Sequence, residues 1–224
     1  MFTRTTQLIG KDKFLALQEA RVIIFGVGGV GGWCAESLLR TGIGHLTLVD
    51  FDVIDRTNLN RQVVSTHNNI GQSKVQEMQK RLLSICPNAD VSTIDIQYNA
   101  DTAASFDLSQ YDVVVDAIDM IECKALLLYN ATLSGCQVFS SMGAGRKLNP
   151  LNIRQTEFWE VQGCPLARAL RNKMKKSHLI PSQKIQCVYS EEIAGECGTL
   201  APVVGVFGMT LASMVIAYVC SNKK

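Results

Sequence analysis

Short apolar runs rich in β-branched residues alternate with longer amphipathic stretches through the first two-thirds of the chain. The short runs predict strands at about 21–26, 45–50, 91–96, 111–116 and 136–140. The stretches between them predict helices at about 29–42, 71–84 and 121–134. Because strand alternates with helix, we expect right-handed crossovers and a doubly wound, mostly parallel α/β sheet with helices on both faces.

The pattern changes after Gly143. A polar, alternating stretch at 151–161 predicts an antiparallel strand, and the basic stretch at 165–176 predicts an amphipathic helix. Residues 177–199 are polar and irregular, which predicts a mobile loop. The C-terminal part of the chain is therefore expected to extend the parallel sheet with antiparallel structure.

The apolar run at 201–220 is long enough to cross a membrane. It contains Gly205, Gly208, Thr210 and Ser213 and lacks aromatic anchors on both sides. We therefore expect a buried helix, packed against the sheet or a dimer partner, and no membrane association.

Composition favours a packed protein with reduced thiols. The chain has 224 residues, of which 47% are hydrophobic, so one sizeable domain is expected. Its eight cysteines include no C-x-x-C pair, which weighs against a structural zinc site. The first residues form no apolar signal region, and a cytoplasmic protein is the simplest interpretation.

Positive charge is concentrated in one segment, although the formal net charge is only +2. Residues 146–184 hold nine Lys or Arg against two Glu, a local charge of +7, and the rest of the chain is therefore −5. Such a run can be a solvated helix face, but an imbalance this large equally indicates an anionic partner.

A glycine-rich turn follows the first predicted strand. Gly26, Gly28 and Gly31 form G-x-G-x-x-G between an apolar run and a helical pattern, and Gly29 adds a fourth glycine. Backbone N–H groups of such a Rossmann-like turn can approach a phosphate at a helix N-terminus. Asp50 ends the next apolar run, where a ribose-binding acid is expected.

The glycines alone would suggest an NAD-dependent dehydrogenase, which transfers a hydride. The cationic and amide residues that follow them indicate a different chemistry. Arg61 and Lys74 can neutralise phosphate charge, and Asn58 and Gln62 lie beside Arg61 in sequence. Asp119 follows the fourth predicted strand and is the candidate ligand for Mg²⁺, although an acid there could also cap the next helix.

Five motifs together resemble the ubiquitin-activating-enzyme-like superfamily, which includes the MoeB and ThiF adenylyltransferases. They are GVGGVGG from Gly26, the acids Asp50 and Asp52, N-L-N-R-Q (58–62), G-x-x-K (71–74) and D-A-I-D (116–119). The resemblance implies one ThiF-like adenylation domain over 1–224, with a nucleotide-binding half (1–145) and a substrate and dimer half (146–224). It also implies a homodimer that uses ATP to adenylate a carboxylate and expels pyrophosphate.

The resemblance also implies residue roles. Asp50 would bind the ribose, Asn58, Arg61 and Lys74 would contact the phosphates, and Asp119 would bind Mg²⁺. Arg4 is similar to an arginine that family members insert into the partner's site. The implied ATP site comprises Gly26, Gly28, Gly29, Gly31, Asp50, Asp52, Asn58, Arg61, Gln62, Lys74 and Asp119, with Arg4, Arg61, Lys74 and Asp119 catalytic.

Within the superfamily, the segment 164–175 and the sequence V-Y-S-E-E at 188–192 resemble the tRNA threonylcarbamoyladenosine dehydratase branch. In that branch adenylation activates a carboxylate on a modified adenosine, and intramolecular attack closes a ring with net loss of water. A tRNA substrate also fits the basic helix, because its phosphates need several cations. Its candidate contacts are Arg168, Arg171, Lys175 and Lys176.

Two alternatives remain at this point. One is an adenylyltransferase that activates the C-terminal glycine of a ubiquitin-like sulfur-carrier protein, and the other is a non-catalytic nucleotide- or tRNA-binding module. A sulfurtransferase or sulfur-acceptor protein is a further possible partner. Cys187 and Cys197 flank a loop where some relatives keep a reactive cysteine, but we expect incidental or packed thiols, since no base or cation is evident beside them.

Overall fold

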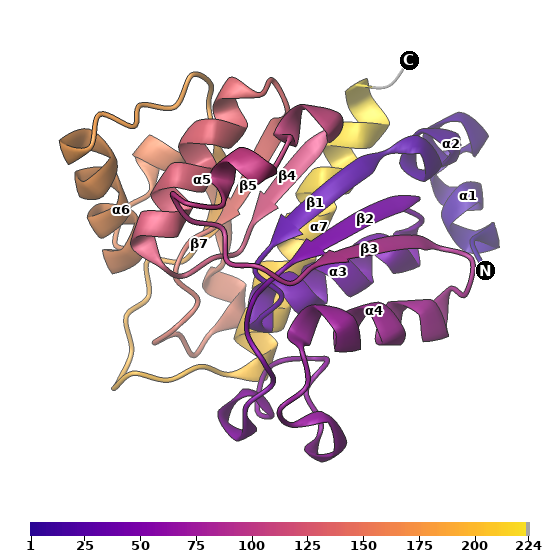
Figure 1. Cartoon of the computed structure of the whole chain (residues 1–224), viewed down its shortest axis with the longest axis horizontal. Helices are drawn as coiled ribbons and strands as arrows, with labels where there is room; N and C mark the ends of the chain where they lie inside the picture. Colours follow the sequence, from indigo (N-terminus) through magenta and orange to yellow (C-terminus); the bar gives the residue numbers. More distant parts are fainter. Residues whose placement is uncertain (223–224) are drawn as a thin grey trace.

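The computed structural model describes residues 1–222, which form a seven-stranded sheet between two layers of helices (Figure 1). In spatial order the strands are β3, β2, β1, β4, β5, β7 and β6, and all neighbours are parallel except β7 with β6. Their bounds are β1 (Arg21–Phe25), β2 (His45–Val49), β3 (Asp90–Ile94), β4 (Val113–Asp116), β5 (Gln137–Ser141), β6 (Arg154–Glu157) and β7 (Gln186–Tyr189). The predicted doubly wound α/β fold with an antiparallel extension is confirmed.

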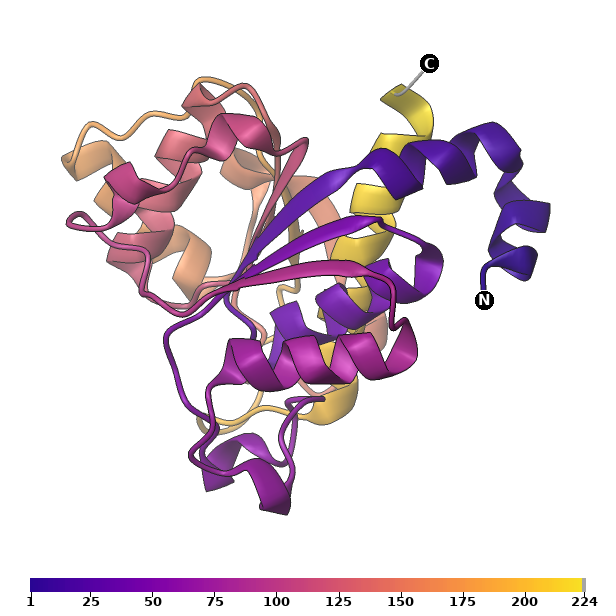
Figure 2. The ribbon, with the colours of Figure 1, turned by 45° about the vertical axis from the view of Figure 1, so that its right-hand side comes forward.

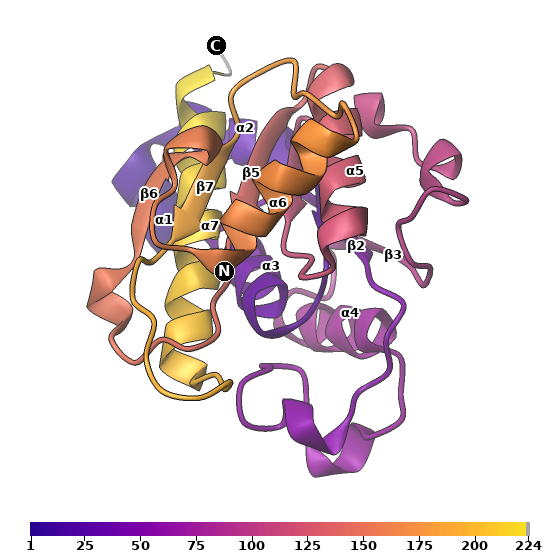
Figure 3. The same ribbon diagram turned by 90° about the vertical axis from the view of Figure 1, so that its left-hand side faces the viewer.

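The helices cover opposite faces of the sheet, as Figure 2 and Figure 3 show. The helices α3 (Gly29–Thr41), α4 (Lys74–Ile85) and α7 (Ala201–Asn222) cover one face, and α5 (Ile121–Leu133) and α6 (Pro165–Lys176) cover the other. Side chains of β1 alternate between the two cores: Val22 and Ile24 pack in the first, Ile23 and Phe25 in the second. All four are fully buried, which explains why a continuous apolar run forms this central strand.

The strand order reverses between β1 and β4. The chain passes from β1 to β2 and β3 on one side, and then returns to continue through β4 and β5 on the other. In open α/β sheets, ligands bind outside the carboxyl ends of the strands at such a reversal.

The apolar C-terminal helix α7 packs closely against α3. A Cβ atom added at Gly208 would lie 2.4 Å from the carbonyl oxygen of Val30 and 2.8 Å from Cβ of Trp33, so only glycine fits this crossing. The helix is long and apolar enough to cross a membrane, with a mean hydropathy of 2.1, but 56% of that window is buried in the fold. The expected buried helix is therefore confirmed.

The structure differs from the predicted elements at two places. The short helices α1 (Thr3–Ile9) and α2 (Lys11–Glu19) precede β1 and were not predicted, since they bury few residues. The loop predicted at 177–199 is wrong for Gln186–Tyr189, which forms β7 beside β5. This strand is four residues long, and its buried surroundings come from distant partners rather than from a local pattern.

Candidate active site

A cavity of about 720 Å³ opens at the carboxyl ends of the central strands. Pockets for small ligands typically have volumes of about 300–1,000 Å³. The residues predicted to bind the nucleotide line it, with the exception of Gly31. Those in the wall are Gly26, Gly28, Gly29, Asp50, Asp52, Asn58, Arg61, Gln62, Lys74 and Asp119. The fold thus brings together residues that lie far apart in the chain.

The glycine turn needs its glycines for two different reasons. Gly26 has a φ of +88°, and a Cβ there would lie 2.7 Å from the carbonyl oxygen of Ala117. A Cβ at Gly31 would lie 1.8 Å from the carbonyl oxygen of Gly26, so Gly31 allows the helix to pack on the turn instead of lining the cavity. Gly28 caps α3 without any side-chain hydrogen bond. The first N–H groups of α3 are therefore available to an anion, which the helix dipole also favours.

The acidic pair after β2 is held in a fixed arrangement. The carboxylate of Asp50 accepts hydrogen bonds from the N–H groups of Val27 (2.7 Å) and Asp52 (2.9 Å). Burial raises the pKa of Asp50, and the positive charge of Lys74 and these two hydrogen bonds oppose that change. Lys74 is buried, and its Nζ lies 2.7 Å from Oδ2 of the half-exposed Asp52. A cation thus sits beside two carboxylates at the cavity wall.

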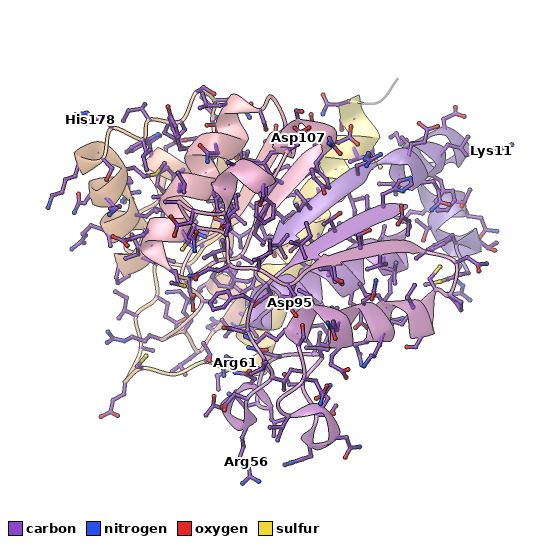
Figure 4. All side chains as sticks on the ribbon, in the orientation of Figure 1. Lys11, Arg56, Arg61, Asp95, Asp107 and His178 are labelled. Carbon is purple, nitrogen blue, oxygen red and sulfur yellow. The ribbon has the colours of Figure 1, made fainter. Side chains whose placement is uncertain are left out.

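The segment after Asp52 presents amide and guanidinium groups. Asp55 N–H donates to the side-chain oxygen of Asn58 at 3.0 Å, so this buried asparagine closes a short 3₁₀ helix (Arg56–Asn58). Nη1 of Arg61 donates to the carbonyl oxygen of Thr57 at 2.7 Å and to Oδ1 of Asn60 at 2.9 Å, which orients the guanidinium and leaves the N–H groups of Nε and Nη2 for a ligand. Figure 4 shows Arg61 beyond the ends of the strands, where the cavity opens.

The two acids of the D-A-I-D motif have different surroundings. Asp119 is exposed and lines the cavity, whereas Asp116 is fully buried and pairs with Lys124. The helix α5 begins after Met120 without a side-chain hydrogen bond to its first turn. The alternative that either acid caps this helix is therefore wrong.

A Mg²⁺ ion fits Asp119 only together with oxygens from a nucleotide. Within residues 1–222, no group of three or more His, Cys, Asp or Glu side chains is placed to bind a metal ion. Mg²⁺ commonly takes one or two carboxylates, with phosphate oxygens and water completing its octahedron. The exposed carboxylate of Asp119 in the cavity wall is compatible with that arrangement.

The segment just before α7 (197–199) forms part of the cavity wall. Thr199 accepts a hydrogen bond from Nδ2 of Asn60 at 3.0 Å, and Gly198 accepts one from the N–H of Arg146 at 2.8 Å. Cys197, in the same segment, is exposed and lines the cavity, so it is not a packed thiol. Cys187 is fully buried in β7, and burial raises the pKa of its thiol, as expected for a packed cysteine.

The basic helix α6 does not present all its cations on one face. Arg168, Lys175 and Lys176 are exposed. Arg171 is partly buried, and its Nη1 donates to the carbonyl oxygens of Phe158 (3.0 Å) and Val161 (2.8 Å). This guanidinium thus anchors the turn before the helix through Nη1, and the assignment of Arg171 to tRNA phosphates stays a prediction.

Other predicted residues lie outside the cavity. Arg4 is exposed on α1 and does not contribute to the wall of its own chain's cavity. Lys147 belongs to the basic segment by sequence but is buried, and its Nζ donates to the carbonyl oxygen of Glu192. The positive surface is thus smaller than the sequence count suggests.

The chain is similar to proteins of known activity. The model of the ThiF family matches residues 2–224. The tRNA threonylcarbamoyladenosine dehydratase of Escherichia coli is 33% identical over 196 residues, which cover 85% of this chain and 73% of that protein. The molybdopterin-synthase adenylyltransferase of Escherichia coli is 29% identical over 90% of this chain and 73% of that protein.

Solved structures give the same relationship. The crystal structure of the Escherichia coli dehydratase, TcdA, in complex with AMP has a TM-score of 0.95 and 30% identity, and the match covers 99% of this chain and 94% of that one. The same enzyme in complex with ATP has a TM-score of 0.93.

Proposed function

The chain belongs to the ThiF family, and from that membership and the geometry of the cavity we propose that it is an ATP-dependent tRNA threonylcarbamoyladenosine dehydratase. The observation that carries the proposal is one cavity that combines a glycine turn at a helix N-terminus, an acidic pair after β2, two cations and the exposed carboxylate of Asp119. The similarity to a dehydratase crystallised with ATP and with AMP supports the same nucleotide here.

The proposed ATP site uses each wall of the cavity. Asp50 accepts hydrogen bonds from the ribose hydroxyls, and the N–H groups at the start of α3 contact the phosphates. Arg61 supplies a planar fork to the phosphate oxygens, and Lys74 supplies a point charge. Both cations stabilise charge that develops on the phosphates as the leaving group departs.

Mg²⁺ is the proposed second cofactor, with Asp119 as its protein ligand. A bound cation would neutralise charge on the triphosphate and its pyrophosphate leaving group. Because Asp119 lies in the loop that follows β4, it would face the nucleotide from the side opposite Lys74 and the acidic pair, which follow β2.

The reaction then proceeds in two displacements. An oxygen of the substrate carboxylate attacks the α-phosphorus of ATP. The bond between this phosphorus and the oxygen that bridges the α- and β-phosphates breaks, and pyrophosphate leaves. A nucleophilic atom of the same threonylcarbamoyl group next attacks the activated acyl carbon, and AMP departs with the former carboxylate oxygen. The ring product has lost one water relative to the substrate, and ATP has become AMP and pyrophosphate.

The exposed cations of α6 are the proposed tRNA contacts. Leu166, in the first turn of α6, lines the cavity, and the helix continues from there to Lys176. Figure 4 shows His178, just beyond the helix, far from Arg61. Arg168, Lys175 and Lys176 could therefore contact phosphates outside the anticodon loop while the modified adenosine enters the cavity.

We also propose a homodimer in which Arg4 completes the partner's site. Its exposed position on α1, outside the cavity of its own chain, is compatible with that role. Mixing Arg4→Ala subunits with Asp119→Ala subunits should restore activity, because one site of each mixed dimer is then intact. Failure of complementation, with mixed dimers present, would remove Arg4 from the mechanism. A cytoplasmic location and an additional sulfurtransferase or sulfur-acceptor partner belong to the same proposal and are secondary to it.

The decisive biochemical test compares two substrates for AMP formation. Purified protein with ATP and Mg²⁺ should form AMP rapidly with tRNA that carries threonylcarbamoyladenosine, and slowly with the same tRNA lacking it. The rival, a sulfur-carrier adenylyltransferase, predicts carrier-dependent ATP–pyrophosphate exchange and no response to that tRNA. Carrier dependence alone would overturn our proposal.

A further inference from the structure

A buried polar cluster lies beneath the loop that carries Asp119. Nζ of Lys124 is 2.5 Å from Oδ2 of Asp116, and both side chains are fully buried. Ser140 on β5 donates from Oγ to the same carboxylate oxygen at 2.6 Å. The cluster therefore links α5, β4 and β5, and it has no place in the nucleotide contacts described above.

Both side chains of the ion pair also bind the backbone of Ile118, the residue before Asp119. The N–H of Ile118 donates to Oδ1 of Asp116 at 3.1 Å, and its carbonyl oxygen accepts from Nζ of Lys124 at 3.0 Å. The N–H and the carbonyl group of Ile118 are thus both held by the side chains of a single ion pair. Asp119, the next residue along the chain, is exposed and lines the cavity.

The same loop contacts the glycine turn. The N–H of Ala117 donates to the carbonyl oxygen of Phe25 at 2.8 Å, and the backbone of Ala117 lies directly against Gly26. A displacement of the loop would therefore move the turn that faces the phosphates. Loop position and nucleotide geometry are coupled through backbone contacts.

We propose that Lys124 and Asp116 are positioning residues, which hold the loop 117–120 so that the Asp119 carboxylate stays at the cation site beside the phosphates. The inference rests on the proposed function for the role of Asp119, but the bracing contacts are independent of it. Ser140 orients the Asp116 carboxylate within this brace.

The energetics favour positioning over stability as the reason for this cluster. A fully buried ion pair loses its hydration, and well-packed apolar replacements of similar size are often as stable or more so. The neighbours of Lys124 along α5 are largely apolar, so a methionine could occupy the same space. What an apolar pair cannot supply is the bond to the Ile118 carbonyl group.

The test uses the double variant D116N/K124M in the full-length protein. The asparagine introduced by D116N can still accept from the N–H of Ile118, whereas the methionine introduced by K124M cannot bind its carbonyl oxygen, and no unpaired charge is left buried. A matched control is E36Q/R81M, which removes the ion pair between α3 and α4 (2.6 Å) away from the cavity. Ser140→Ala is a milder variant that keeps the ion pair.

The first readout is hydrogen–deuterium exchange of a peptide spanning 117–120, and the second is the Mg²⁺ concentration that half-saturates metal-dependent ATP binding. Partners that orient a metal ligand typically contribute about 10- to 100-fold to metal affinity. We expect a rise in the half-saturating Mg²⁺ concentration of that order in D116N/K124M, with faster exchange in the peptide and a smaller loss of metal-free ATP affinity, which the contact between the loop and the glycine turn transmits. Ser140→Ala should give a smaller shift in the same direction.

Unchanged exchange and unchanged Mg²⁺ dependence in D116N/K124M would overturn the proposal, as would equal changes in E36Q/R81M. If the double variant does not fold, Ser140→Ala decides alone, and the absence of any shift in it would be equally contradictory. Wild-type protein that binds ATP with Mg²⁺ but never acts on modified tRNA would refute the proposed function and leave these readouts interpretable.

Discussion

Replacing Lys74 with methionine removes a buried cation from the cavity while keeping the length of the side chain. In the structure its Nζ lies 2.7 Å from Oδ2 of Asp52, and its charge opposes the rise in the pKa of the partly buried Asp50 that desolvation causes. The substitution therefore has two expected effects: the phosphates lose a cation, and two carboxylates at the ribose end lose their counter-charge.

The size of the effect follows from the contact that is lost. A hydrogen bond to a charged group contributes about 1.5–3 kcal/mol. Since about 1.4 kcal/mol corresponds to tenfold in affinity, we expect ATP affinity to fall roughly 10- to 150-fold. Folding should suffer less, because Asp52 is half-exposed and water can replace the lost partner.

The assay is calorimetric titration with ATP and with AMP. We propose that Lys74 contacts the outer phosphates of ATP, which AMP lacks, so the affinity for AMP should fall by a much smaller factor. Lys80→Met is the matched control, since Lys80 lies on the same helix, is 70% exposed and pairs only with Glu77 among the contacts described. Equal losses for ATP and AMP would refute the assignment of Lys74 to the outer phosphates.

Four further predictions test other parts of the site. Asp119→Ala should abolish turnover without changing the thermal unfolding midpoint, and a normal rate of AMP formation would exclude it from the mechanism. Changing Lys175 and Lys176 to Glu should weaken tRNA binding more than ATP binding and flatten its salt dependence, so filter binding at several salt concentrations that shows parallel losses would contradict a tRNA surface there. Burial raises the pKa of Asp50, so its carboxylate, which is proposed to accept hydrogen bonds from the ribose hydroxyls, becomes protonated at a higher pH than usual as the solution is acidified. ATP affinity should accordingly weaken as the pH falls from neutrality, and Asp50→Asn protein should bind ATP weakly at every pH. If the ATP affinity of the wild-type protein did not change with pH, this role of Asp50 would be contradicted. Gly208→Val should destabilise the fold by about 1–3 kcal/mol, because the new side chain would clash with α3. A thermal unfolding midpoint, measured by calorimetry, equal to that of the wild type would show that α3 and α7 can move apart without loss of stability.

The local sequence pattern was sufficient to predict site residues where their function and their local structure depend on the same short segment. The glycines at 26–31 predicted both a turn and a phosphate contact, and Asp50 and Lys74 followed recognisable strand and helix boundaries. Their convergence in one cavity follows from the parallel order of the strands, which alternation alone predicts.

Local pattern did not predict the contacts that residues make with other elements of the fold. Lys124 appears in the sequence as one charged residue before an apolar run, and only the fold shows its buried partner on β4. Arg171 matches the spacing of a basic face, but backbone carbonyls from the preceding turn capture its guanidinium. The strand β7 is too short for periodicity to reveal and is defined by its pairing with β5 and β6. In each case the deciding interaction is made by residues far along the chain or in another element.

The most direct test of the central claim is mass spectrometry of tRNA nucleosides before and after incubation with the protein. The tRNA should carry threonylcarbamoyladenosine in its open form, and ATP and Mg²⁺ should be present or omitted in parallel. We predict that this nucleoside loses the mass of one water only in the complete reaction, and that Asp119→Ala protein leaves it unchanged. If active, nucleotide-binding protein left the nucleoside intact in the complete reaction, the account of this site as a tRNA dehydratase would be wrong.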